Sequence, residues 1–331
     1  MSTLCRKVLQ RFLAAGGLVL ACAAVPARAE LADDVTTFLS DYDRLAAVRQ
    51  EVATDRDAMA GKLGDAQALK KAVREFFNDR DQAQSLRVLK AADRKQMRAT
   101  LKALQAKEPG SPAAKTGGGG SPATNSLLQD ATAFIANYDQ WLALQAVVTQ
   151  DIAQLRVDVA GVNADPASTY AAAALIASTK KFFDDSRARL NARLQWQAAV
   201  RALKKDVGFK GTGKPQPPQG ETLTQHVAHF LSDRAEWETL GTQLDADRNN
   251  IRAALGATES LTSVVMSFLT DRRARRVKGQ ELALDRKVMR ADLGLRSSKE
   301  GKTGALFGSR DLDTDDEDDA LDQSSDESGE K

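Results

Sequence analysis

The sequence has 331 residues, of which 42% are hydrophobic and 28% charged, a balance typical of a soluble folded chain of about two domains. Only 5% are aromatic, two are His and two are Cys, and both Cys (Cys5 and Cys22) lie near the amino terminus. A mature chain of this composition cannot build a Cys-rich zinc site, a disulfide framework or a Cys–His catalytic pair.

Residues 1–29 are typical of a secretory signal peptide. They begin with basic residues, continue with a short apolar run and end on Ala27-Arg28-Ala29, a small-x-small cleavage pattern. The apolar run is shorter than the ~20 residues that span a bilayer. Leu18–Cys22 also resembles a bacterial lipobox, in which Cys22 would be lipidated and would anchor the chain to a membrane. On either interpretation the chain is exported to the periplasm or beyond.

Two stretches rich in Gly, Pro and Ser, residues 106–125 and 207–220, divide the rest of the chain. Such a composition without apolar periodicity predicts flexible linkers. Between and beside them lie three segments of similar length, 30–105, 126–206 and 221–296. Residues 297–331 are rich in Asp, Ser and Gly, and we expect them to form a disordered acidic tail.

The three segments are copies of one another, and each contains the same short unit twice. The unit is a Phe, an Asp or Asn three residues later and, in five copies of six, an Asp seventeen residues after the Phe. The copies are Phe38 with Asp41 and Asp55, Phe76 with Asp79 and Asp93, Phe134 with Asn137 and Asp151, Phe182 with Asp185, Phe230 with Asp233 and Asp247, and Phe268 with Asp271 and Asp285. Ala199 replaces the missing Asp. We interpret this signature as a structural one, from a helical unit that was duplicated into a hairpin and then tripled.

Apolar residues in the first half of each segment recur in alternating steps of four and three, as in Leu31, Val35 and Phe38. This period predicts long helices that keep one stripe toward a partner. Glycines near the middle of each segment end the first helix and allow a second to begin. The predicted fold class is therefore all-α, with three tandem long antiparallel helical hairpins and six helices. The hairpins would pack in a coiled-coil-like manner or as a six-helix bundle, or the stripes would pair two chains.

Charge is unevenly distributed along the chain. Residues 311–331 contain eleven acidic residues and one basic residue, whereas residues 30–310 contain 42 basic and 34 acidic residues. Opposite charges would let the tail cover a basic surface until an anionic ligand competes for it. The alternative is a tail that only keeps the chain soluble.

The densest basic run lies in the third segment and consists of Arg272, Arg273, Arg275, Arg276 and Lys278. These cations cannot all face one side of a helix. Because no aromatic residue interleaves with them, stacking on nucleic-acid bases is not indicated. The run is a candidate basic patch for an anionic ligand, without sequence-specific nucleic-acid recognition.

His226 and His229 are the only His in the chain and stand three residues apart. Two imidazoles at this spacing are a weak candidate for a metal site if carboxylates complete the set. The corresponding residues of the other copies are Asp34 and Thr37, then Asp130 and Ala133, so we interpret the His pair as surface substitutions. We expect no metal, no cofactor and no catalytic residue.

Six near-equal copies of one unit fit a repeated core or surface, whereas a catalytic site is normally singular. The sequence therefore predicts an exported, non-enzymatic helical-repeat scaffold or adaptor of the bacterial cell envelope. It would bind a protein partner or associate with itself. The alternative function is that of a periplasmic holdase-like chaperone or a polyanion-binding protein gated by its acidic tail. An enzyme would need converging carboxylates or lysines in a cleft, which no motif indicates.

Overall fold

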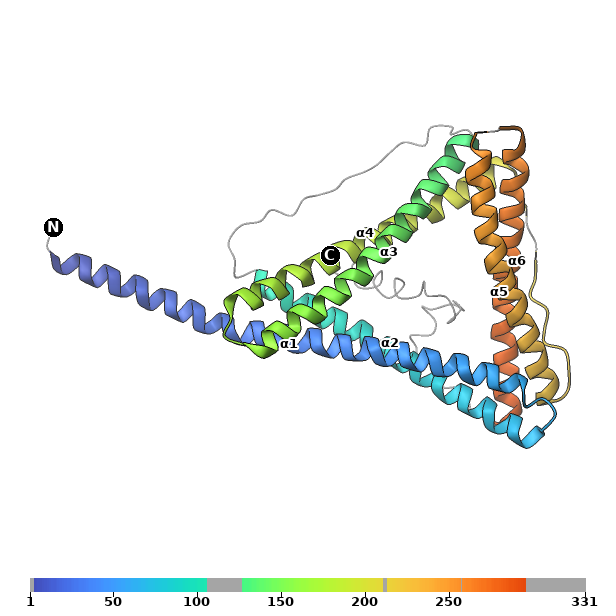
Figure 1. The fold of residues 1–331 in the computed structure, drawn as a ribbon, viewed down its shortest axis with the longest axis horizontal. Coiled ribbons are helices and arrows are strands. Elements are labelled where there is room, and N and C mark those ends of the chain that lie inside the picture. Colours follow the sequence, from blue (N-terminus) through green and yellow to red (C-terminus); the bar gives the residue numbers. More distant parts are fainter. Residues whose placement is uncertain (1–2, 106–126, 211–212, 257, 296–331) are drawn as a thin grey trace, which may run out of the picture. The chain divides into compact units, whose positions relative to one another are not determined.

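The computed structural model describes residues 3–105, 127–210, 213–256 and 258–295 (Figure 1). These residues form helices and their connections, and they contain no strand. The helices are α1 Thr3–Ala60, α2 Ala66–Gln105, α3 Leu127–Ala164, α4 Thr169–Asp206, α5 Leu223–Ala254 and α6 Thr258–Asp292. The linker predicted over 106–125 and the tail predicted over 297–331 lie outside the described residues.

Consecutive helices pack closely as the antiparallel pairs α1·α2, α3·α4 and α5·α6, so the predicted all-α fold of three tandem hairpins is confirmed (Figure 1). Local capping explains where the helices begin. A carboxylate oxygen of Asp65 accepts hydrogen bonds from the N–H groups of Gln67 and Ala68 at the start of α2. Thr222 and Gln225 form a reciprocal capping box at the start of α5.

Helix α1 begins inside the segment predicted to be a signal peptide and continues without a break across its predicted cleavage site. Among the described residues, no helix combines the length and the apolar character that crossing a membrane requires. The signal peptide, its cleavage after Ala29 and the alternative lipidation of Cys22 stay predictions.

The chain divides into two compact units, of which the first comprises Met1–Arg44, Val88–Gly119 and Ala143–Arg189. Its apolar core is formed by residues of four helices. Each hairpin has a turn end, where its two helices are connected, and an open end, where the hairpin begins and finishes. In this core the open end of the first hairpin packs against the turn end of the second. Phe38 and Phe182 lie inside this core, with their ring centroids 5.5 Å apart. Within this unit, a signature Phe of the first hairpin therefore packs against a signature Phe of the second hairpin.

The second unit comprises Leu45–Arg87, Gly120–Leu142 and Leu190–Lys331, and it holds two cores of the same design. In one, the open end of the second hairpin packs against the turn end of the third, and the rings of Phe134 and Phe268 are 4.9 Å apart. In the other, the open end of the third hairpin packs against the turn end of the first. There the rings of Phe76 and Phe230 are 5.7 Å apart.

All six signature Phe side chains are buried, with exposed fractions of 0 to 2%. Each pair of rings adds about 0.5–1.5 kcal/mol to the stabilisation from buried area alone. The apolar stripes are thus buried within the chain. The large hydrophobic side chains that stay exposed are scattered over four helices: Val88 and Leu89, Leu142 and Val157, Tyr170 and Leu194, and Met266.

Candidate functional site

The hairpin geometry brings the signature carboxylates face to face. The two Asp of one helix are fourteen residues apart, which is about 21 Å along the axis. Because the partner helix is antiparallel with the same spacing, the Asp near one Phe faces the distant Asp of the other helix. The pairs are Asp41–Asp93, Asp55–Asp79, Asp151–Asp185, Asp233–Asp285 and Asp247–Asp271. The sixth equivalent position holds Asn137 and Ala199.

Two of these pairs show why a facing carboxylate raises a pKa. Burial raises the pKa of Asp55 to about 6, and the hydrogen bond and charge of Asp79 add to the effect. Burial likewise raises the pKa of Asp93 to about 6, together with the charge and hydrogen bond of Asp41. In the described part of the chain, Oδ2 of Asp55 and Oδ2 of Asp93 are buried without a hydrogen-bond donor. A proton shared between the two carboxyl groups of a pair would supply that donor.

A lysine takes the place of the shared proton at the Asp151–Asp185 pair. Lys181 Nζ lies 2.5 Å from Asp151 Oδ1 and 2.7 Å from Asp185 Oδ2. Its hydrogen bonds to Asp151 and then Asp185 raise the pKa of Lys181. The equivalent pairs Asp55–Asp79 and Asp151–Asp185 are therefore neutralised differently: the first by a proton, the second by Lys181.

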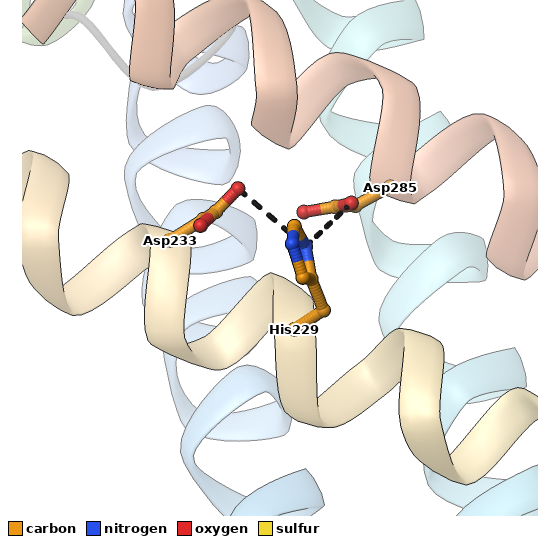
Figure 2. Close-up of side chains that lie close together, drawn as sticks. All are labelled: His229, Asp233 and Asp285. Atoms are coloured by element: carbon orange, nitrogen blue, oxygen red, sulfur yellow. Dashed lines mark hydrogen bonds and ion pairs between the residues drawn. The ribbon is translucent and has the colours of Figure 1, made fainter. Parts of the chain in front are cut away.

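The Asp233–Asp285 pair is joined by His229, which Figure 2 shows between the two carboxylates. His229 and Asp233 lie on α5 and Asp285 lies on α6. His229 Nδ1 is 3.0 Å from Asp285 Oδ1 and 3.6 Å from Asp233 Oδ2. Burial raises the pKa of Asp285 to about 6, although the hydrogen bond from His229 opposes this. The three side chains place one nitrogen and two oxygen ligand atoms within 4.8 Å of one another, close enough to hold a metal ion.

His226 lies elsewhere, so the two His named by the sequence do not share a site. The interpretation of the pair as surface substitutions was wrong, because His226 is buried and both imidazoles are held by carboxylates of α6. Its Nδ1 is 2.6 Å from Asp292 Oδ2, and its Nε2 is 3.1 Å from the carbonyl oxygen of Gly220. Gly220 has a φ of 128°, a conformation that favours glycine. His226 therefore fastens the start of α5 to the end of α6. Sequence reasoning missed that Asp233 and Asp285 complete the set around His229.

The structure divides the predicted basic patch. Lys278 Nζ lies 2.9 Å from Asp233 Oδ1 and also contacts Glu236 and Glu281. The Arg275 guanidinium stacks over the Trp237 ring at 4.0 Å. These two cations are therefore turned toward side chains of the same hairpin.

Arg272, Arg273 and Arg276 instead gather near Lys204 of α4, and we name these four residues the basic cluster. Burial lowers the pKa of Lys204, and the charges of Arg272, Arg276 and Arg273 lower it further. Burial also lowers the pKa of Arg272, with contributions from the charges of Arg248 and Arg276. Within the described ranges, no carboxylate forms an ion pair with any member of the basic cluster. Among the described residues, the cluster is therefore a group of like charges without an ion-pair partner.

The basic cluster has no counterpart in the other hairpins. The residues that correspond to its three arginines are Arg80, Asp81 and Gln84 in the first hairpin, and Ser186, Arg187 and Leu190 in the second. Each of those sets contains a single cation, so the accumulation of charge arose in the third hairpin alone.

Comparison with protein-family models, with curated proteins and with solved structures found no match to this chain. Two polar groupings have no equivalent at the corresponding positions of the other repeats: the basic cluster, formed by α6 and Lys204 of α4, and the set of His229, Asp233 and Asp285.

Proposed function

We propose that this chain is an exported, non-enzymatic helical-repeat scaffold or adaptor that binds an acidic partner through the basic cluster. The observation that carries the proposal is the convergence of Lys204, Arg272, Arg273 and Arg276 without a carboxylate partner among the described residues. Elsewhere in the hairpins, cations such as Lys181 contact carboxylates.

The electrostatics of the basic cluster favour a bound anion. Like charges that lie close together and partly out of water disfavour the folded state, and the pKa of Lys204 is lowered first by burial and then by the charges of the three arginines. A purely structural role would be served better by an acidic or apolar neighbour. A carboxylate or phosphate from a partner relieves the repulsion and forms charge-assisted hydrogen bonds with the guanidinium groups.

The repeated framework supports a scaffold rather than an enzyme. The carboxylate pairs recur at equivalent positions in all three hairpins, and the Phe pairs recur in all three cores. Groups that recur in this way build the architecture. The apolar stripes are buried in those cores, so the surface left for a partner is mainly polar.

A second candidate is a polyanion binder gated by the acidic segment 311–331. It is favoured by the same basic cluster, because that cluster offers a surface of opposite charge to the eleven acidic residues of the segment. The two candidates differ in one outcome. Deleting residues 311–331 raises the affinity for an anionic probe if the segment competes, and leaves it unchanged if the segment does not.

The test uses the mature chain and a fluorescent oligo-aspartate peptide, with binding followed by fluorescence anisotropy at low salt. The variant Arg273→Gln/Arg276→Gln removes two charges from the basic cluster. The matched control, Lys70→Gln/Lys95→Gln, removes two charges from exposed positions on α2. Losing two charge-assisted contacts weakens binding by about tenfold or more.

We expect that loss in the cluster variant and a loss of less than about twofold in the control, where only long-range charge is changed. An equal loss in both variants would mean that only net charge attracts the probe. No binding by the unmodified chain, even after deletion of residues 311–331, would remove the proposal.

A further inference from the structure

One of the carboxylate pairs lies beside a His side chain, which can bind a metal ion, and the corresponding pairs of the other hairpins have no such neighbour at that position. At Asp233–Asp285 an imidazole nitrogen approaches both carboxylates (Figure 2). The corresponding residues of the other hairpins are Thr37 and Ala133, which cannot provide a nitrogen. The third hairpin thus adds a nitrogen donor to a buried pair of oxygen donors.

The spacing of the three donors suits a small divalent cation. A tetrahedral zinc ion with bonds of about 2.0–2.1 Å separates neighbouring ligand atoms by roughly 3.3–3.4 Å. The distances from His229 Nδ1 to Asp285 Oδ1 and Asp233 Oδ2 are 3.0 and 3.6 Å, on either side of that value. The three ligand atoms all lie within 4.8 Å of one another.

Both carboxylates are buried and retain an oxygen for a ligand. The side chains of Asp233 and Asp285 are 4% and 0% exposed. In the part of the chain that the structure describes, Oδ2 of each is buried without a hydrogen-bond donor. A buried carboxylate oxygen without a donor disfavours the folded state, and a metal ion beside His229 satisfies Oδ2 of Asp233 directly.

The charges around the site also fit a divalent ion. Asp233, Glu236 and Glu281 surround Lys278, and Arg286 acts on Asp285. With Asp285, these named groups are four carboxylates and two cations, so among them the negative charges exceed the positive ones by two when His229 is neutral. Lys278 contacts Oδ1 of Asp233 and leaves Oδ2 free to face His229.

We propose that His229, Asp233 and Asp285 bind one divalent transition-metal ion, of the class that accepts one imidazole and two carboxylates, with Zn²⁺ as the best match. The ion takes Nδ1 of His229 and one oxygen from each carboxylate, and water completes its coordination. Lys278 holds Asp233 in place from outside the coordination sphere. The ion joins α5 to α6 and stabilises this end of the third hairpin, independently of any acidic partner.

The first experiment titrates the tag-free mature chain, stripped of metal with a chelator, with ZnCl₂ and follows heat release and thermal unfolding. We expect one Zn²⁺ per chain and a Tm that rises with Zn²⁺ concentration. The variant His229→Thr introduces the residue of the first hairpin, Thr37, and should lower the affinity by more than about tenfold.

The control variant His226→Gln removes the imidazole that binds Asp292 and should keep the Zn²⁺ affinity. Unchanged affinity in His229→Thr, or an equal loss in His226→Gln, would overturn the proposal. So would the absence of stoichiometric binding, or a stronger response to Ca²⁺ than to Zn²⁺.

A second measurement does not depend on whether a variant folds. Because the chain has only two His, nitrogen NMR of the unmodified protein resolves both imidazoles. Zn²⁺ should shift the signal of Nδ1 of His229 and leave those of His226 in place. A shift confined to His226 would contradict the proposed site.

Discussion

The carboxylate pairs should make the folded chain less stable at pH 7.5 than at pH 5. The pKa of Asp55 rises from 3.8 to about 6 on folding, and so does that of Asp93. The folded chain therefore binds more protons than the unfolded chain between these values. The stability that each pair contributes is fully present below the unfolded pKa and is lost as the pH rises through about 6.

A pKa change of this size corresponds to roughly 3 kcal/mol, at about 1.4 kcal/mol per unit. Both side chains are partly exposed, and solvent screening reduces the contribution to about 1–2 kcal/mol for each pair. About half of this loss falls between pH 5 and pH 7.5, because the unfolded carboxyl groups are already ionised at pH 5, so the two pairs together should lower the free energy of unfolding by about 1–2 kcal/mol over that range.

The variant Asp55→Asn/Asp93→Asn tests this reasoning. Each amide can donate a hydrogen bond to the facing carboxylate and carries no charge, and the chain itself places Asn137 at the position that corresponds to Asp41, the partner of Asp93. We expect the variant to gain about 1–2 kcal/mol per pair at pH 7.5 and about half as much at pH 5, where only the unfolded carboxyl groups are ionised.

The assay is urea unfolding followed by circular dichroism at both pH values, with Asp184→Asn as the control, because Asp184 is exposed and adjacent to Asp185 of another pair. The difference between variant and unmodified chain isolates the two pairs from other titrating groups. A variant that is less stable than the unmodified chain at pH 7.5 would refute the shared-proton account.

Three further predictions concern packing, charge and export. Phe230→Ala should lower the free energy of unfolding by about 3–5 kcal/mol, because the ring is buried and contacts Phe76; a thermal melt that matches the unmodified chain would contradict the proposed core. Lys181→Met should destabilise the chain more at pH 7.5 than at pH 5, by about 1–3 kcal/mol, because Asp151 and Asp185 lose their common donor; equal effects at both pH values in urea unfolding would count against this. Expression in a bacterial host should yield an intact mass that begins at Glu30 or carries lipid on Cys22, and a chain that retains Met1–Ala29 would contradict export.

The sequence was sufficient to predict the fold class, because the heptad stripe and the glycine breaks are local features. Gly61 and Gly64 separate α1 from α2 where the helical period was expected to stop. The partners of the stripes were not predictable in the same way. Phe38 of the first hairpin packs against Phe182 of the second hairpin. The periodicity of a sequence identifies the apolar face of a helix, but it does not identify the helix that packs against that face.

The candidate site was predicted in part. The residue spacing singled out His226 and His229 as a pair, but the antiparallel register of α5 and α6 gives each a different partner. His226 meets Asp292, and His229, about one turn further along α5, meets Asp285, two turns earlier on α6. The equal fourteen-residue spacing of Asp on both helices was the signal that could have placed Asp233 opposite Asp285.

The basic run shows a similar limit. Its composition indicated an anionic ligand, but only the packing of the helices separates the cations. Lys278 is drawn to carboxylates of its own hairpin, whereas Arg272, Arg273 and Arg276 meet Lys204 from another helix. Cations far apart in the sequence thus form the cluster, and no local pattern records that contact.

The most direct test of the central claim is the ratio of dissociation constants for the oligo-aspartate probe between Arg273→Gln/Arg276→Gln and Lys70→Gln/Lys95→Gln. A ratio of about five or more would follow if the basic cluster contacts the acidic partner directly. A ratio near one would contradict the claim, because the basic cluster would then attract the probe only through its contribution to the net charge of the chain.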